Sequence, residues 1–147
     1  MRILVIDGQG GGIGKTIIEK LKPLLPPEHL LVAVGTNSIA TTAMLKAGAV
    51  HIATGENAVC HNARHADIIL GSLGILSANA MFGELSPAMA QAISESDAMK
   101  ILIPMKRCGL YVVGMTGDPL PVMIDEAVDV VLDALRQKQG CDRSSQA

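Results

Sequence analysis

The fold is decided by Ile3-Leu4-Val5-Ile6-Asp7-Gly8-Gln9-Gly10-Gly11-Gly12-Ile13-Gly14-Lys15-Thr16, where an apolar run breaks into a glycine-rich turn and then into a helical pattern. The run is short, β-branched and without alternation, which favours a strand buried on both faces. Beyond the turn, apolar residues recur at helical spacing: Ile13, Ile17, Ile18, Leu21 and Leu24. A helix that begins after such a turn offers N–H groups and the positive end of its dipole to an anion. The stretch therefore predicts a loop that binds a nucleotide phosphate.

The spacing of the glycines indicates which kind of nucleotide-binding loop this stretch forms. The strict G-x-G-x-x-G fingerprint fails, and so does the Walker A pattern, because Gln9 stands where its first glycine belongs. Gly8, Gly12 and Gly14 instead give G-x-x-x-G-I-G, which resembles the cofactor loop of the short-chain dehydrogenases/reductases. That resemblance implies that Gly8 makes the turn, Gly12 lets the backbone approach a pyrophosphate, and Gly14 lets the helix pack close to the strands. A glycine-rich turn without a ligand stays open as an alternative.

The expected roles of Lys15 and Thr16 differ between the possible functions. In a P-loop-like nucleotide phosphatase or switch, Lys15 and Thr16 would bind phosphate and Mg²⁺. In a dehydrogenase-like loop Lys15 is solvated on the first helical turn, and we prefer this because a Walker glycine is missing. Asp7 is expected to accept N–H bonds from the turn rather than to act in catalysis. A third alternative is a non-catalytic assembly protein with a degenerate loop.

The composition fits one soluble domain. With 147 residues and 49% hydrophobic content, the chain can bury one core. We expect a domain over residues 1–138 and a disordered tail over residues 139–147. The 12 basic and 14 acidic residues give a formal net charge of -2, and the aromatic side chains are Tyr111 and Phe82. A nucleic-acid binder would have a basic face and stacking rings, so that class is excluded.

The cysteine spacing, the apolar runs and the histidine positions predict where the protein is located and whether it binds a metal. The three cysteines share no C-x-x-C spacing, and the chain shows neither a signal-peptide core nor an apolar run of membrane-spanning length. These features predict a cytoplasmic protein without membrane contact. His61 and His65 stand at i, i+4 on an expected helix, but no third ligand is evident, so no metal site is expected.

Strands and helices alternate along the chain. After the first strand and helix, strands are expected at residues 30–35, 50–53, 67–71, 101–105 and 110–115, and helices at residues 39–47, 55–65, 87–96 and 121–135. Residues 106–109 are too few for a parallel crossover, so the last two strands should form an antiparallel hairpin. We therefore predict an α/β fold: a single Rossmann-like three-layer domain with strand order 3-2-1-4-5, a mostly parallel sheet and an antiparallel C-terminal edge strand.

Ligands of such sheets bind beyond the carboxyl ends of the strands, where the strand order reverses. The expected cofactor-binding residues at this edge are Gly8, Gln9, Gly10, Gly11, Gly12, Ile13, Gly14, Lys15, Thr36, Asn37, Ser38, Glu56, Asn57, Gly71 and Ser72. The expected cofactor is NADP or NAD. NADP is favoured because the second strand ends in Gly35 and not in an acidic residue, so no carboxylate would repel a 2′-phosphate. The loop of residues 72–87 should overhang the crevice, where Glu84 and Asn79 are candidates for chemistry, although hydrogen bonding within loops is the preferred role.

Taken whole, the chain resembles a family of short bacterial proteins known as a domain of unknown function. The resemblance rests on residues 7–15, 35–41 and 53–58, covers nearly everything except the tail, and implies no activity. The short-chain dehydrogenase likeness is narrower and is confined to the first loop and the general Rossmann order. This chain departs from that family, which is much longer and has a Tyr-x-x-x-Lys pair that is absent here. Tyr111 is followed four places later by Met115. We expect a dinucleotide-binding homo-oligomer, acting as a sensor or as part of an enzyme, with the catalytic residues left open.

Overall fold

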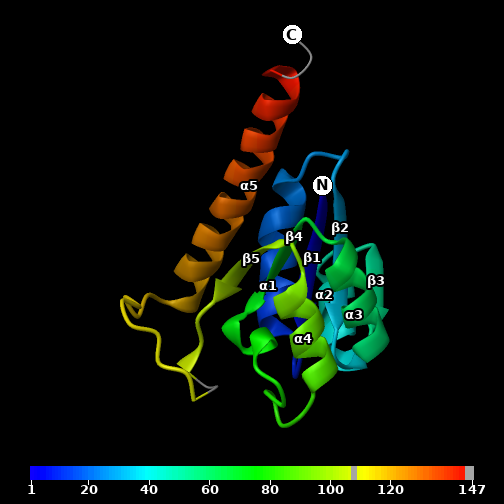
Figure 1. Ribbon diagram of the computed structural model, residues 1–147, viewed down its shortest axis with the longest axis vertical. Helices are drawn as coiled ribbons and strands as arrows, with labels where there is room; N and C mark the ends of the chain where they lie inside the picture. The colour runs from blue at the N-terminus through cyan, green and yellow to red at the C-terminus, as the bar shows by residue number, and fades with distance from the viewer. Residues whose placement is uncertain (107–108, 145–147) are drawn as a thin grey trace.

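The apolar runs of the sequence form a sheet of parallel strands. The computed structural model describes residues 1–106 and 109–144, and its five strands follow the order β3-β2-β1-β4-β5 (Figure 1). The strands are β1 Arg2–Asp7, β2 Leu30–Gly35, β3 His51–Thr54, β4 Ile68–Ser72 and β5 Met99–Ile103. Each neighbouring pair is parallel. This arrangement fits the Rossmann-like layout and the strand order predicted from the sequence.

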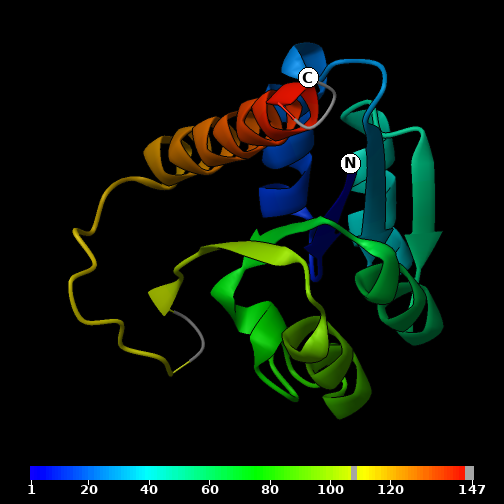
Figure 2. The ribbon, with the colours of Figure 1, turned by 45° about the horizontal axis from the view of Figure 1, so that its top comes forward.

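Helices cover both faces of the sheet (Figures 1 and 2). One face carries α1 Gly12–Leu21, α2 Ser38–Lys46 and α5 Leu120–Ser144. The other face carries α3 Glu56–His65 and α4 Pro87–Glu95. Two 3₁₀ turns, η1 Lys22–Leu24 and η2 Leu73–Leu76, follow α1 and β4. Two apolar cores result, one on each side of the sheet.

The central strand β1 is buried on both faces. Ile3 and Val5 pack in the core that α1 and α5 cover, whereas Leu4 and Ile6 pack in the core of α3 and α4. All of these side chains are fully buried, and burying one of this size stabilises a fold by about 1.5–3 kcal/mol. The two-sided burial explains why the run has no polar alternation.

The register brings the carboxyl ends of the strands level with one another. Asp7 lies opposite Gly35, and Gly35 lies opposite Thr54. Val5 pairs with Leu70, which places the end of β4 beside the end of β1. The turns that follow these strands therefore begin at one edge of the sheet, as the sequence predicts.

The segment after β5 differs from the prediction. The antiparallel edge strand expected at residues 110–115 is wrong: residues 109–119 contain no strand, and the described sheet is parallel throughout. Gly109, Gly114 and Gly117 take left-handed backbone angles, and β-branched residues form a strand only beside a partner strand. Figure 2 shows this segment, in yellow, running clear of the sheet. We call residues 109–118 the arm; Cys108 lies outside the described residues.

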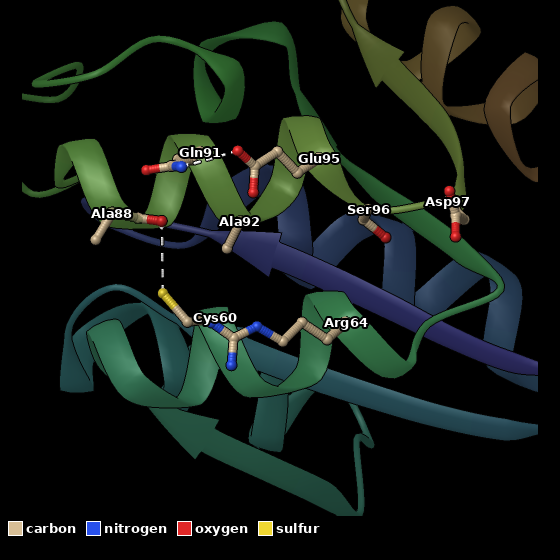
Figure 3. A pocket seen from close by; sticks show the side chains of 8 residues that line it. All are labelled: Cys60, Arg64, Ala88, Gln91, Ala92, Glu95, Ser96 and Asp97. Carbon is tan, nitrogen blue, oxygen red and sulfur yellow. Dashed lines mark hydrogen bonds between the residues drawn. The ribbon is translucent and has the colours of Figure 1, made fainter.

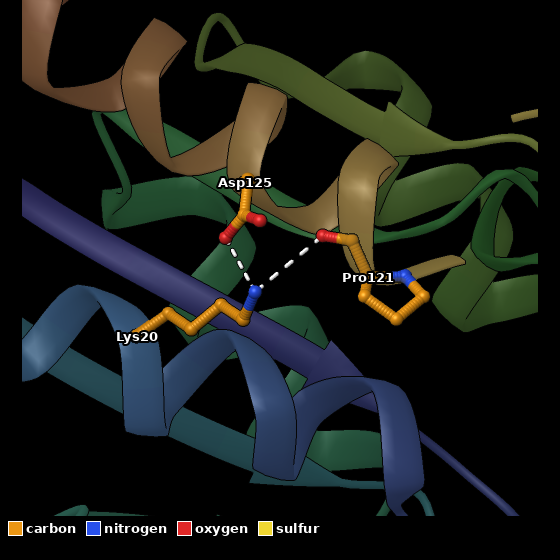
Figure 4. A network of polar contacts seen from close by, with 3 residues as sticks. All are labelled: Lys20, Pro121 and Asp125. Atoms are coloured by element: carbon orange, nitrogen blue, oxygen red, sulfur yellow. Dashed lines mark hydrogen bonds and ion pairs between the residues drawn. The ribbon is translucent and has the colours of Figure 1, made fainter. Parts of the chain in front are cut away.

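The last helix, α5, is anchored on α1 and extends further than expected. Its buried side chains are those that the helical spacing predicts: Ile124, Val128, Val131 and Leu135. The Lys20 ammonium of α1 donates to the Asp125 carboxylate and to the carbonyl oxygen of Pro121 (Figure 4). The sequence predicts a disordered tail from residue 139, but α5 continues to Ser144, because adding a turn to an existing helix needs no new nucleation. Residues 145–147 lie outside the described part of the chain.

None of the helices in residues 1–106 and 109–144 is long and apolar enough to cross a membrane.

Candidate functional site

Asp7 ends β1 and holds the glycine-rich turn together. Its carboxylate accepts hydrogen bonds from the N–H groups of Gly8 at 2.8 Å and Gly14 at 2.6 Å. Burial of the side chain raises the pKa of Asp7 above its ordinary value of 3.8; hydrogen bonds from Gly14, Gly8 and Ile13 oppose the rise, and the nearby Glu84 carboxylate adds to it. The turn-stabilising role expected of Asp7 is confirmed, because its carboxylate is engaged by the backbone of the turn.

Three glycines of the turn are required by packing. A Cβ atom on Gly8 would lie 2.5 Å from the sulfur of Met81, and one on Gly14 would lie 2.8 Å from the Cβ of Asp7. Gly11 has a φ of 73°, and its Cβ would lie 2.7 Å from the Cα of Ala40 in α2. Gly14 thus lets α1 approach the strand closely, as the loop resemblance implies. Gly8 makes room for the segment that follows β4, rather than only for the turn itself.

Two other glycines face open space. A Cβ atom on Gly10 or Gly12 would meet no atom within 4 Å. Both border a cavity of about 270 Å³, which is lined by Asp7, Gly8, Gln9, Gly10, Gly11, Gly12, Ile13, Ser72, Met81, Met105 and Leu120. The N–H group of Gly12 has no hydrogen-bond partner among the described residues and belongs to the first turn of α1, where the helix dipole favours an anion. The arrangement suits a phosphate held against the backbone.

The sequence predicts the wall of this cavity that the glycine loop forms, but not the opposite, apolar wall. Gly8 to Ile13 and Ser72 were expected there, and Ser72 is 6% exposed. Met81, Met105 and Leu120 were not expected, because nothing local in the sequence shows that the turn after η2, the segment after β5 and the start of α5 meet over the glycines. Only tertiary structure brings these apolar side chains to the same place.

Lys15 and Thr16 do not line the cavity. The Lys15 ammonium lies 3.8 Å from the Glu19 carboxylate on the outside of α1, and both side chains are about half exposed. The Thr16 hydroxyl donates to the carbonyl oxygen of Gly12 at 2.9 Å. These are the contacts of an ordinary first helical turn, which is the role we preferred for Lys15.

At the end of β2, the predicted residues contact a distant carboxylate. Glu84 Oε2 accepts hydrogen bonds from the Gln9 N–H at 2.6 Å and the Thr36 hydroxyl at 3.0 Å, and Glu84 Oε1 accepts one from the Asn37 amide at 3.0 Å. Asn37 also caps α2, since its Oδ1 accepts from the Ala40 N–H at 2.8 Å. The hydrogen bonding between loops that we expected as the role of Glu84 is confirmed.

The turn that carries Glu84 is tightly constrained. Asn79, Met81 and Phe82 have φ values of 64°, 58° and 58°, a region that non-glycine residues rarely adopt. Such backbone costs about 1–3 kcal/mol per residue and persists only where surrounding contacts fix it. Here Leu85 is fully buried in the core, and its carbonyl oxygen accepts from the Asn79 N–H at 2.7 Å. These contacts thus hold the turn, and with it Glu84, beside the loops that follow β1 and β2.

The remaining predicted residues are not brought into the cavity. Ser38, Glu56 and Asn57 are exposed on the first turns of α2 and α3. Gly71 is buried, and a Cβ atom there would lie 2.7 Å from the carbonyl oxygen of Ile6, so its role is packing within the sheet.

A second, polar cavity of about 410 Å³ lies between α3 and α4, on the opposite face of the sheet from α1 (Figure 3). The Cys60 thiol donates to the carbonyl oxygen of Ala88 at 3.5 Å, and the Gln91 amide donates to Glu95 at 2.8 Å. The His61 and His65 rings pack edge to face at 4.8 Å. These contacts are the ordinary ones of two neighbouring surface helices.

The parallel sheet, its strand order and the glycine-rich turn before α1 define the class of this protein: a Rossmann-like α/β domain. Residues 2–136 match the family described as Domain of unknown function (DUF3842). The chain belongs to that family, so the resemblance to a domain of unknown function is confirmed. No significant similarity was found to a curated protein or to a solved structure.

Proposed function

We propose that this protein binds a dinucleotide, NADP or NAD, with its phosphates at the loop of residues 8–15, and acts as a sensor or as part of an oligomeric enzyme. The observation that carries the proposal is the open backbone at Gly10 and Gly12, beside the N-terminus of α1. A phosphate binds such a loop only where no side chain keeps it from the N–H groups. The chain keeps glycine at both of these positions, although neither glycine is needed for packing.

The surroundings of the loop support a ligand longer than a phosphate. The cavity at Gly12 measures about 270 Å³, and a neighbouring one of about 610 Å³ shares Gln9 and Met81 with it. Either alone is near the volume of a small-molecule site, typically about 300–1,000 Å³. A dinucleotide with its pyrophosphate at Gly12 would extend past Met81 into this neighbouring cavity of about 610 Å³. Phe82, fully exposed on the wall of that cavity, offers an aromatic face to a base.

The P-loop-like alternative has less support. It needs Lys15 to reach phosphate, whereas Lys15 lies beside Glu19 on the outer surface of α1. It also needs the Thr16 hydroxyl on Mg²⁺, whereas that hydroxyl donates to the Gly12 carbonyl oxygen. A dinucleotide held by the backbone requires neither side chain.

We also propose that the protein self-associates through the arm. Tyr111 and Val113 are 92% and 89% exposed, and their neighbours Leu110 and Val112 are exposed too. Contiguous exposed apolar side chains are typical of interaction surfaces. Light scattering at micromolar concentration should give a multiple of the monomer mass, and Val113→Asp should shift it toward the monomer. A monomer mass for the unaltered protein would contradict this part of the proposal.

A thermal-shift screen with NAD, NADP, ATP and GTP, each with and without Mg²⁺, tests the function. A ligand that binds the native state raises the melting temperature by mass action. We expect NAD or NADP to raise it without Mg²⁺. A shift seen only with ATP or GTP plus Mg²⁺ would favour the phosphatase or switch, and the absence of any shift would favour a non-catalytic assembly protein.

A further inference from the structure

The carboxylate of Glu84 stands where dinucleotide-binding domains place an acidic side chain, although it comes from a different part of the chain. In such domains an Asp or Glu at the end of the second strand accepts hydrogen bonds from the adenosine ribose hydroxyls. Here β2 ends in Gly35. The Thr36 hydroxyl and the Asn37 amide, which follow it directly, both donate to Glu84.

The donors that the sequence offers to a 2′-phosphate are already in use. The Asn37 amide donates to the carbonyl oxygen of Gln9 as well as to Glu84, each at 3.0 Å, so both of its hydrogens are engaged. The Thr36 hydroxyl donates its proton to Glu84. A carboxylate therefore lies beside the end of β2 although β2 itself ends in Gly35, and the sequence argument that favoured NADP did not include this charge.

The carboxylate keeps capacity for one kind of ligand. A carboxylate has about four lone-pair positions, and the hydrogen bonds from Gln9, Thr36 and Asn37 leave one on Oε1. A free hydroxyl group can donate to that position. A phosphate brings only acceptors and negative charge, and it would be repelled.

We propose that Glu84 is the specificity-determining residue of this site, selecting an adenosine ribose with free hydroxyls and rejecting one with a 2′-phosphate. NAD is then the preferred ligand and NADP the rejected one. This inference rests on the proposed dinucleotide binding, because it assumes that the adenosine half lies toward β2. Glu84 acts through its charge and acceptor atoms, and the turn of residues 79–83 holds it in place.

Calorimetric titration of NAD and NADP into the unaltered protein, Glu84→Gln and Glu95→Gln tests the inference. Glutamine keeps the size of the side chain and an oxygen that can accept from Gln9 and Thr36, but it removes the charge. The unaltered protein should bind NAD at least about tenfold more tightly than NADP, and Glu84→Gln should reduce that ratio about tenfold by strengthening NADP. Glu95→Gln removes the same charge from the exposed face of α4 and should leave the ratio unchanged.

A second measurement uses only the unaltered protein, should Glu84→Gln fold poorly. Adenosine 5′-monophosphate should compete with NAD at least about tenfold better than adenosine 2′,5′-bisphosphate. Equal competition, or an unchanged NAD-to-NADP ratio in folded Glu84→Gln, would overturn the role of Glu84 while leaving dinucleotide binding intact. If the unaltered protein binds neither dinucleotide, both the proposed function and this inference fall.

Discussion

On the α1 side of the glycine-rich turn, Gly10 and Gly12 face open space, whereas on the β2 side Gly8 is covered by Met81, Thr36 and Glu84. Both sides belong to one short stretch of sequence and carry the same residue type. On the β2 side the Gln9 N–H and the Thr36 hydroxyl donate to Glu84, whereas on the α1 side the Gly12 N–H has no hydrogen-bond partner among the described residues. A run of glycines thus combines positions that close packing requires with positions that a ligand would use.

Replacing Asp7, which joins the two sides of the turn, should change the free energy of unfolding most. Asp7→Ala removes the acceptor of the Gly8 and Gly14 N–H groups, both in buried residues. Each unsatisfied group costs about 1–3 kcal/mol, so we expect the free energy of unfolding to fall by about 2–6 kcal/mol. Urea denaturation at neutral pH measures it. Asp129→Ala, on the exposed face of α5, is the control and should change it by less than about 0.5 kcal/mol; an equal effect of the two substitutions would contradict the account.

Alanine at Gly14 and alanine at Gly12 compare a glycine that close packing requires with one that faces open space. Gly14→Ala should lower the free energy of unfolding by about 1–3 kcal/mol, because the methyl group would overlap Asp7 and Met44. Gly12→Ala meets nothing and should be neutral or stabilising by up to about 1 kcal/mol, as alanine favours a helix over glycine. Paired denaturation curves decide the matter, and a larger loss for Gly12→Ala would show that the roles are reversed.

The smallest expected effect is the pH dependence that Asp7 contributes. Because burial raises its pKa above 3.8 in the folded protein, the native state holds the Asp7 proton to a higher pH than the unfolded chain does. The part of the stability that depends on this proton is therefore present at low pH and lost as pH rises through the folded pKa, whereas the hydrogen bonds from Gly8 and Gly14 remain. The difference in unfolding free energy between the unaltered protein and Asp7→Asn should shrink as pH rises from 4 toward 7. A difference that grows over this interval would contradict the raised pKa.

Much of the fold was predictable because its signals are local. The residues of β2, 30–35, are those expected from their apolar pattern, and the parallel strand order follows from the alternation of strands with helices. The antiparallel edge strand predicted at residues 110–115 is wrong, because its signal was local but a strand needs a partner. Apolar β-branched residues favour a strand, but only a neighbouring strand can satisfy the backbone, and none pairs with the arm among the described residues.

The candidate site was predictable from its backbone but not from its tertiary contacts. The open positions Gly10 and Gly12 lie within the motif, and Asp7 acts on the turn beside it in sequence. Glu84 and Asn37 are 47 positions apart, and no periodic pattern links them. The sequence argument for NADP rested on the absence of an acidic residue after β2, and it could not include the Glu84 carboxylate, which reaches this place from another loop.

The proposed dinucleotide binding depends most on Gly12, where we expect a nucleotide phosphate to contact the backbone. Gly12→Val directs a branched side chain into the open space, since a Cβ atom at Gly12 would meet nothing within 4 Å and φ is not in the left-handed region. Calorimetric titration of NAD into the unaltered protein and Gly12→Val, with a thermal melt of each, tests the claim. We predict heat of binding from the unaltered protein, none from Gly12→Val, and melting temperatures within about 4 °C of each other. Unchanged NAD binding by a normally folded Gly12→Val protein would contradict the assignment of the loop.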